Sequence, residues 1–244
     1  MSTACTVTHL EMLTHDIRLV RLEPRSGEVL EFRAGQYATL GFAGFEARDY
    51  SFAGRPGDLP LEFHVRDMGS GLSQHVVRHL KIGDPAALVG PLGTATLRHA
   101  PGRPILAVAG GSGLAPIKSI VEAALEAGQR APVHLYFGAR TARDLYLLEH
   151  FSRLARRHRN LRFVPVVLDP VDAEGRRQGL VDSAIAEDFQ SLEGYHAYLA
   201  GPPALVEAAA ALLRGRGMAD MDIHADAFYT MTDLRQRGAA PPKH

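Results

Sequence analysis

The sequence has one cysteine, no net charge and no long hydrophobic run. Cys5 is the only cysteine among 244 residues, which excludes an internal disulfide, a zinc site built on several thiolates and an iron–sulfur cluster held by four cysteines of this chain. Lysine plus arginine and aspartate plus glutamate number 27 each, so no overall field favours nucleic acid or an anionic membrane. We expect neither as a partner.

Apolar segments of membrane-spanning length are also missing. No run approaches the roughly 20 residues that a transmembrane helix needs, and no cationic-then-apolar leader opens the chain. We therefore expect a cytoplasmic protein. Its 46% hydrophobic and 22% charged residues are typical of a packed globular chain, whose length suits one large domain or two of ordinary size.

Three glycines within four residues form the most informative segment that is present. Gly110, Gly111 and Gly113 follow the apolar run 105–109, which is typical of a buried parallel strand, and Pro116 opens an amphipathic helix. Free N–H groups and the positive end of the helix dipole would point into this turn, so it is a candidate phosphate site. It matches neither the Rossmann fingerprint nor a P-loop, and a tight connection without a ligand is the alternative.

Residues 6–97 have the pattern of an antiparallel β-domain. Short alternating or apolar runs, separated by Gly, Pro and Asp, predict several strands and one inserted helix, and this combination suggests a small barrel. The predicted strands are 17–22, 37–42, 61–66 and 86–89, and the predicted helix is 72–80.

Two motifs in this β-domain allow both a structural and a functional interpretation. Arg48-Asp-Tyr-Ser51 would place Arg48 and Tyr50 on one face of a strand and Ser51 on the other, and alone it is typical of an ordinary edge strand. Residues 69–73 combine glycines and hydroxyls at a helix start, which is either a capping arrangement or an anion site. We expect no metal site.

Strands and helices alternate from residue 105 onward, which predicts a doubly wound, mostly parallel sheet. In such sheets ligands bind beyond the carboxyl ends of the strands, where the loops 110–112, 138–140 and 200–203 would meet. The basic run 153–162 we interpret as a solvated helix face. The predicted strands are 105–109, 133–137, 163–168, 198–200 and 223–228, and the predicted helices begin at 116, 144, 180 and 204.

A turn-rich stretch, residues 99–104, separates the two halves. We therefore divide the chain into a β-domain, an α/β domain and a flexible tail. The boundaries are 1–100, 101–230 and 231–244.

Taken in order, the motifs resemble the ferredoxin–NAD(P)H reductase superfamily of flavoproteins, and in particular the reductase components of bacterial oxygenases. The resemblance implies an antiparallel six-stranded β-barrel that binds FAD, followed by a doubly wound α/β parallel sheet that binds NAD(P)H. The matching motifs are Arg48-Asp-Tyr-Ser51, Gly71-Leu-Ser73, Gly90-Pro-Leu-Gly93, Gly110–Pro116, Ala200-Gly-Pro-Pro203 and His224–Phe228.

The resemblance also implies roles for individual residues. Toward FAD it implies Arg48, Gly71, Leu72 and Ser73 on the pyrophosphate, Tyr50 along the ribityl chain and ring, Ser51 near the hydride-accepting nitrogen, and His64, Val65 and Arg66 along the ring edge and adenosine side. Around the nicotinamide nucleotide it implies Gly111, Ser112, Gly113, Gly138, Arg140, Ala200, Gly201 and Pro202. Phe228, or Tyr229 next to it, would cover the flavin until nicotinamide displaces it, and Ser51, Ser112 and Phe228 would lie nearest the reacting atoms.

The implied reaction is hydride transfer from NAD(P)H, with NADH preferred, onto FAD. Electrons would then pass to a separate ferredoxin or oxygenase component, and we expect a monomer. The family usually has cysteine where this chain has Ala200, and we expect activity to survive that change at a reduced rate. Two alternatives remain: a reductase of freely diffusing flavin, and a non-catalytic nucleotide-binding module for electron transfer or sensing.

Overall fold

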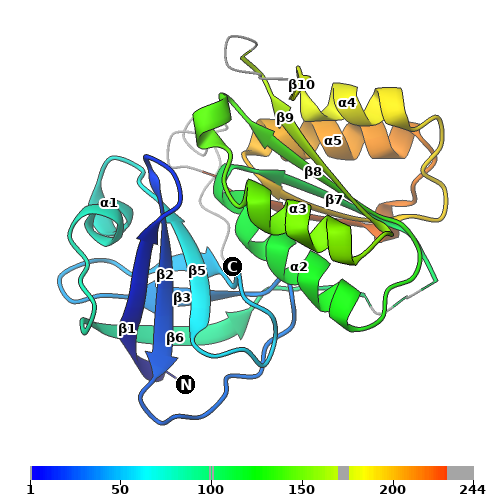
Figure 1. Ribbon diagram of the computed structural model, residues 1–244. Coiled ribbons are helices and arrows are strands. Elements are labelled where there is room, and N and C mark those ends of the chain that lie inside the picture. The colour runs from blue at the N-terminus through cyan, green and yellow to red at the C-terminus, as the bar shows by residue number, and fades with distance from the viewer. Residues whose placement is uncertain (1, 99, 101, 170–175, 230–244) are drawn as a thin grey trace.

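The computed structural model describes residues 2–98, 100, 102–169 and 176–229, and these form two sheets of six strands each. Figure 1 shows a β-domain built from the first half of the chain beside an α/β domain built from the second half. This order confirms the two-domain architecture predicted from the sequence. The predicted tail, 231–244, lies outside the described residues.

The first sheet is antiparallel, with the strand order β4-β3-β6-β1-β2-β5. Its two edge strands approach each other through a bridge between Phe52 and Phe63 and a hydrogen bond of 2.8 Å from the Ala53 N–H to the Glu62 carbonyl. The sheet therefore curls into a barrel. Its elements are β1 Ser2–Met12, β2 Ile17–Pro24, β3 Tyr37–Gly41, β4 Arg48–Ser51, β5 Leu61–Arg66, β6 Pro85–Leu92 and the helix α1 Gly71–Arg78.

The long strand β1 is absent from the strands predicted above. Its sequence of small and polar residues has no aromatic or large aliphatic run to mark a strand. It forms because β2 and β6 pair with it on either side, which buries Cys5 and Val7 completely. Long-range pairing, and not local pattern, fixes this strand.

The second sheet is parallel, with the order β10-β9-β8-β7-β11-β12. In Figure 1, α2 and α3 lie on one face of this sheet and α4 and α5 on the other. The doubly wound prediction is confirmed. The elements are β7 Ile105–Gly110, α2 Leu114–Glu126, β8 Val133–Ala139, α3 Leu148–Arg157, β9 Leu161–Val167, β10 Arg177–Gln178, α4 Val181–Asp188, β11 His196–Gly201, α5 Pro203–Gly215 and β12 Ile223–Ala227.

The direction of winding reverses between β7 and β11. The chain passes from β7 outward through β8 and β9 to β10, then returns to the other side of β7 as β11. Such a reversal leaves a crevice beyond the carboxyl ends of the two central strands, where open α/β sheets bind ligands. Those strands end at Gly110 and Gly201.

Two helix starts differ from the prediction by two or more residues, and the other three by one residue. Residues 111–113 form a 3₁₀ turn that leads directly into α2, so this helix begins at Leu114 and Pro116 lies in its first turn. The helix α3 begins at Leu148, and not at Asp144, because Leu147 adopts a left-handed φ of 55° that interrupts the helical path. A helical spacing of apolar residues cannot reveal such a backbone reversal at a leucine.

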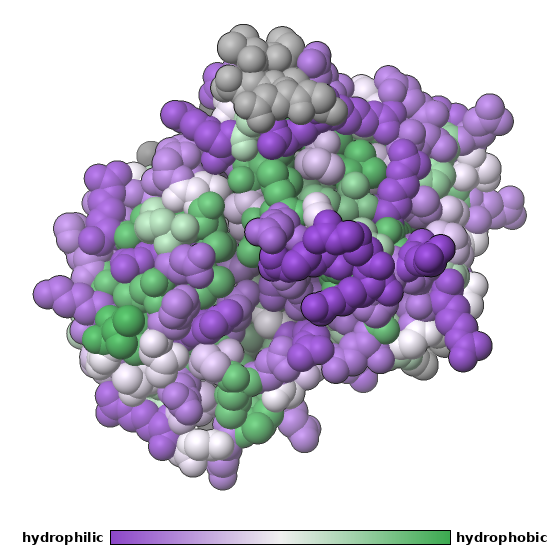
Figure 2. Space-filling view, viewed as in Figure 1, coloured by the Kyte–Doolittle hydropathy of each residue, from purple (hydrophilic) through white to green (hydrophobic). Residues whose placement is uncertain are grey.

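The outer surface of α3 is polar. Figure 2 shows hydrophilic side chains gathered at the front of the α/β domain, over α3. Arg153 pairs there with Glu149 at 2.5 Å, one turn away on the same helix. None of the helices within the described ranges has the length and apolar character needed to cross a membrane.

Candidate functional site

The loops after β7 and β11 touch backbone to backbone at the crevice. A Cβ placed on Gly113 would lie 2.2 Å from the Ala200 carbonyl oxygen, and one on Gly201 would lie 2.7 Å from the Gly110 carbonyl oxygen. Only glycine fits at these two positions. Two of the three predicted loops therefore meet at one edge of the sheet.

The third loop, after β8, adjoins them. Gly138 pairs with Gly110 across the sheet, but a Cβ on Gly138 would lie 2.4 Å from Val181 Cγ2 of α4. Packing against α4 thus explains this glycine without a ligand. Arg140 is exposed at the end of β8, where its side chain is open to solvent.

The turn before α2 provides hydrogen-bond donors at the crevice. The N-cap residue of α2, Gly113, has no side-chain cap, and the N–H of Leu114 already donates to the Gly111 and Ser112 carbonyls, so the donors at the crevice are those of the turn 111–113 that precedes the helix. Ser112 is partly exposed beside them. This arrangement can accept an anionic group such as a phosphate.

Of the two aromatic residues after β12, Phe228 faces the crevice. Its N–H donates to the Gly201 carbonyl at 2.9 Å, and its ring packs against the apolar core that also contains Ala200. Tyr229 points elsewhere, with its hydroxyl 3.2 Å from Glu207 of α5. Phe228 is therefore the better placed to cover a ring in the crevice.

The motif on β4 presents a charged, an aromatic and a hydroxyl residue in succession. Arg48 is exposed and pairs with Glu46 at 2.7 Å, so its guanidinium can exchange this partner for an anion. Burial raises the pKa of Tyr50 to about 12, so this phenol stays protonated. Ser51, at the strand end, is buried.

The N-terminus of α1 lies close to this motif. Ser70, its N-cap, makes no side-chain cap, and Gly71 has a left-handed φ of 64°. Ser73 Oγ accepts from the Met68 N–H at 3.1 Å, which fixes the turn before the helix. These first-turn N–H groups and Arg48 form a donor set that fits a pyrophosphate.

One ring contact shows that the loop before β4 and the helix α1 are neighbours. The ring of Phe45, from the loop that leads into β4, stacks on His75 of α1 with a centroid distance of 4.4 Å. The loop before Arg48 therefore lies against the helix that begins at Gly71.

Strand β5 is the part of the barrel that lies nearest the turn 111–113. Val65 lies in the barrel core, so only its backbone can meet a ligand, whereas Arg66 lies on the opposite face and pairs with Asp16 at 2.8 Å. Arg66 Nη1 would lie 3.4 Å from a Cβ on Gly111. The imidazole of His64 is buried at the domain interface, and burial lowers its pKa.

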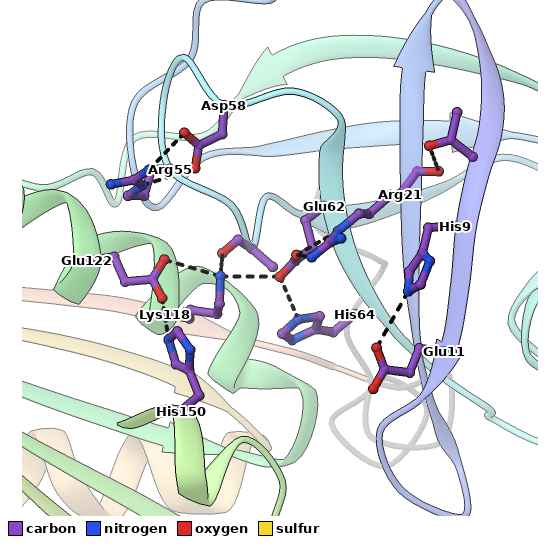
Figure 3. Close-up of polar contacts among 12 residues, drawn as sticks. His9, Glu11, Arg21, Arg55, Asp58, Glu62, His64, Lys118, Glu122 and His150 are labelled. Atoms are coloured by element: carbon purple, nitrogen blue, oxygen red, sulfur yellow. Dashed lines mark hydrogen bonds and ion pairs between the residues drawn. The ribbon is translucent and has the colours of Figure 1, made fainter. Parts of the chain in front are cut away.

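The sequence patterns do not predict a buried charge cluster that lies across the domain interface. Figure 3 shows Lys118 of α2 between two carboxylates, 3.2 Å from both Glu62 of β5 and Glu122 of α2. Its ammonium also donates to the Ala53 carbonyl at 3.1 Å. Lys118 is the only basic residue of α2, and its local sequence does not mark Glu62 of β5 as its partner.

Two domain families match the chain in succession. The Oxidoreductase FAD-binding domain matches residues 4–97, and the Oxidoreductase NAD-binding domain matches residues 107–211. The chain is 45% identical over 225 residues to the ferredoxin–NAD(P)+ reductase component of the naphthalene 1,2-dioxygenase/salicylate 5-hydroxylase systems of a Ralstonia species. That match covers 92% of this chain and 68% of the Ralstonia protein.

Two solved structures share the fold throughout. The Amycolatopsis cytochrome P450 reductase GcoB superposes with a TM-score of 0.85 at 36% identity, over 93% of this chain and 70% of that one. The ferredoxin reductase of carbazole 1,9a-dioxygenase gives a TM-score of 0.85 at 28% identity, over 94% of this chain and 70% of that one.

Proposed function

The chain belongs to the family of ferredoxin–NAD(P)+ reductase components of oxygenase systems, and on that premise we propose that its two motif sets hold FAD and a nicotinamide nucleotide next to each other where β5 meets Gly111. It is an NAD(P)H-dependent flavoprotein oxidoreductase with an FAD-binding and an NAD-binding domain. The observation that carries the proposal is the proximity of Arg66, one of the residues assigned to FAD, to Gly111 of the nucleotide turn: a Cβ on Gly111 would lie 3.4 Å from Arg66 Nη1.

On the flavin side, the chain's own residues bind and orient the cofactor. Arg48 and the first N–H groups of α1 bind the pyrophosphate, while Tyr50 and Ser51 line the ring and His64 and Val65 contribute backbone groups. FAD, when bound, supplies a ring that accepts hydride and releases electrons one at a time. Residues 1–100 form this domain.

On the nucleotide side, the turn 111–113 and the loop 200–202 admit the nicotinamide half, and Gly138 and Arg140 border the far half. Phe228 excludes water from the flavin until the nucleotide arrives. Residues 101–230 form this domain, and we propose that the protein acts as a monomer.

The electron acceptor is a separate protein, a ferredoxin or an oxygenase component. The 244 residues contain one cysteine, so they provide no set of thiolates for an iron–sulfur cluster of their own. Relatives carry names of reductase components that work within multi-component oxygenase systems.

Gel filtration and an acceptor assay test this proposal against its two rivals. A protein that stays yellow on the column holds FAD as a prosthetic group, whereas loss of colour would favour a reductase of diffusing flavin. Reduction of ferricyanide or cytochrome c by NADH excludes a module that binds nucleotides without turnover. Failure of both acceptors to be reduced would refute the proposed reaction.

We propose that NADH is the preferred donor. Binding the extra phosphate of NADPH needs more than one cation near the adenosine half; Arg140 is exposed there, but Arg177 is already paired with Glu187 at 2.6 Å and Asp188 at 2.7 Å. We expect kcat/KM for NADH to exceed that for NADPH by about tenfold, which corresponds to one missing charge-assisted contact. Initial rates with each nucleotide measure the ratio, and equal values would contradict the preference.

Ala200→Cys is expected to raise the rate of hydride transfer. Ala200 is 1% exposed beside Gly113, and a slightly larger side chain there would hold the nicotinamide more firmly. Stopped-flow absorbance after mixing with NADH measures the rate. Ala200→Ser, of similar size, separates the effect of sulfur from that of volume, and an unchanged or slower rate in Ala200→Cys would contradict the prediction.

A further inference from the structure

A buried tyrosine connects the barrel to the glycine turn that we assign to the nicotinamide nucleotide. Tyr146 is 3% exposed, and its hydroxyl oxygen lies 3.3 Å from the Gly111 carbonyl oxygen and 3.2 Å from His64 Nδ1. His64 belongs to β5 of the barrel, whereas Tyr146 and Gly111 belong to the α/β domain. One hydroxyl group therefore bridges the two domains at the turn.

The other members of this contact are fixed in place. His64 Nε2 lies 3.3 Å from Oε1 of Glu62, and that carboxylate is also held by Arg21 at 3.0 Å. The Tyr146 ring packs edge-on against the rings of His64 and Phe137, with centroid distances of 5.4 Å to each. The hydroxyl is thus held firmly by the packing around it.

The carbonyl group that Tyr146 meets belongs to the residue that shapes the turn. Gly111 has a left-handed φ of 53°, and its oxygen also accepts from the N–H of Leu114, the first residue of α2. Strand β5 lies near Gly111 at two points: Arg66 Nη1 would lie 3.4 Å from a Cβ on Gly111, and His64 contacts Tyr146, whose hydroxyl oxygen lies 3.3 Å from the Gly111 carbonyl oxygen.

Tyr146 has a single hydrogen to donate. Burial raises the pKa of Tyr146, so the hydroxyl keeps that hydrogen. Because the ionised Glu62 carboxylate can only accept, the hydrogen of the neutral His64 imidazole lies on Nε2, toward Glu62. Nδ1 of His64 then accepts the hydrogen of Tyr146, and the Tyr146 hydroxyl oxygen packs against the Gly111 carbonyl oxygen at 3.3 Å.

We propose that Tyr146 is a positioning residue for the nicotinamide nucleotide. Its hydroxyl is bonded to His64 of β5, and by packing against the Gly111 carbonyl it fixes the orientation in which the turn admits the nucleotide. The inference rests on the proposed function of residues 111–113. Because Tyr146 acts through Gly111, it determines nucleotide affinity and leaves the reaction at saturating nucleotide largely unaffected.

Tyr146→Phe tests the inference, because it keeps the ring and removes only the hydroxyl. We expect the NAD+ dissociation constant, measured by calorimetry, and the KM for NADH to rise about 5- to 10-fold, as for one lost hydrogen bond. We expect kcat to change less than about twofold, and FAD content to equal that of the native protein.

Tyr136→Phe is the matched control. Tyr136 is equally buried in the same domain, and its hydroxyl bonds to Asp188 on the opposite face of the sheet. This variant should leave the NAD+ dissociation constant and the KM unchanged. A rise equal to that of Tyr146→Phe would overturn the inference, because any lost buried hydroxyl would then have the same effect.

Two further results decide against the inference. An unchanged NAD+ affinity in Tyr146→Phe overturns it, and so does a fall in kcat or FAD content as large as the fall in affinity. His64→Leu removes the hydrogen-bond partner of Tyr146, so it should weaken NAD+ binding. Adding it to Tyr146→Phe should cause no further loss, and additive losses would contradict the proposal.

A native protein that binds NAD+ and oxidises no NADH would refute the proposed function alone, whereas absence of NAD+ binding would refute both the proposed function and this inference.

Discussion

Lys118→Met is expected to lower the free energy of unfolding by about 3–5 kcal/mol, the loss typical when one partner of a buried ion pair is removed. Lys118 is 8% exposed, and its ammonium lies 3.2 Å from carboxylate oxygens of both Glu62 and Glu122. Methionine keeps much of the side-chain length and loses the charge. Two buried carboxylates would then share the domain interface without their common cation. Urea denaturation followed by circular dichroism measures the change.

The difference in unfolding free energy between the native protein and Lys118→Met should depend on pH. Burial alone would raise the pKa of Glu62, but the His64 hydrogen bond and the Lys118 charge outweigh it and hold this pKa well below its ordinary value. A lowered pKa means that Glu62 stabilises the fold above about pH 4.3, its unfolded value, and that this contribution is lost as pH falls through the folded value. Without Lys118 the folded-state pKa of Glu62 rises, so the difference in unfolding free energy between native protein and variant should shrink as pH falls through the variant's folded-state pKa toward the lower value of the native protein.

Lys81→Met is the matched control for Lys118→Met. Lys81 is exposed, so its replacement should change the free energy of unfolding by no more than about 0.5 kcal/mol. Adding Glu62→Gln to Lys118→Met should recover part of the loss, because it removes one of the two uncompensated charges. A loss in Lys118→Met no larger than that of the control would contradict the importance of this cluster.

Gly113→Ala is expected to reduce kcat/KM for NADH by about 100-fold, the loss associated with misplacing reacting groups by about 1 Å. Its backbone conformation suits alanine, so the effect is steric: the new methyl would lie 2.2 Å from the Ala200 carbonyl oxygen. The loops after β7 and β11 must separate to admit it. Overpacking of this kind also lowers stability by about 1–3 kcal/mol. Steady-state kinetics and thermal unfolding measure both effects.

Gly215→Ala provides the comparison for Gly113→Ala. Gly215 ends α5, and no atom lies within 4 Å of the position of its Cβ. Alanine there should be neutral or stabilising by up to about 1 kcal/mol, with NADH kinetics unchanged. Equal NADH kinetics in the two variants would show that the two loops do not need their close contact.

The sequence predicts those parts of the fold that depend on local pattern. The apolar stripe of α2 is buried as its helical spacing predicts, with Ile117, Ile120 and Val121 in the core against the sheet. Alternation of strands and helices likewise predicts the parallel sheet. For α2 and for the sheet, the residues that pack together follow from periodicity alone.

Features that depend on distant partners do not follow from the sequence. Lys118 lies next to the apolar stripe of α2, and only its partner Glu62, 56 residues earlier, explains its burial. Leu147, the residue before α3, has a left-handed backbone, and no local pattern marks a leucine for that conformation. The preceding residue, Tyr146, lies beside Gly111. Lys118 and Tyr146 lie at the domain interface, where the two halves of the chain determine each other's contacts.

An absorption spectrum of the purified protein, taken before and after NADH is added without oxygen, tests the central claim most directly. We expect the absorbance of bound flavin in the first spectrum and its bleaching in the second. A colourless protein that takes up no added FAD, and that shows no bleaching with NADH or NADPH, would contradict the claim that this chain transfers hydride from a nicotinamide to a bound flavin.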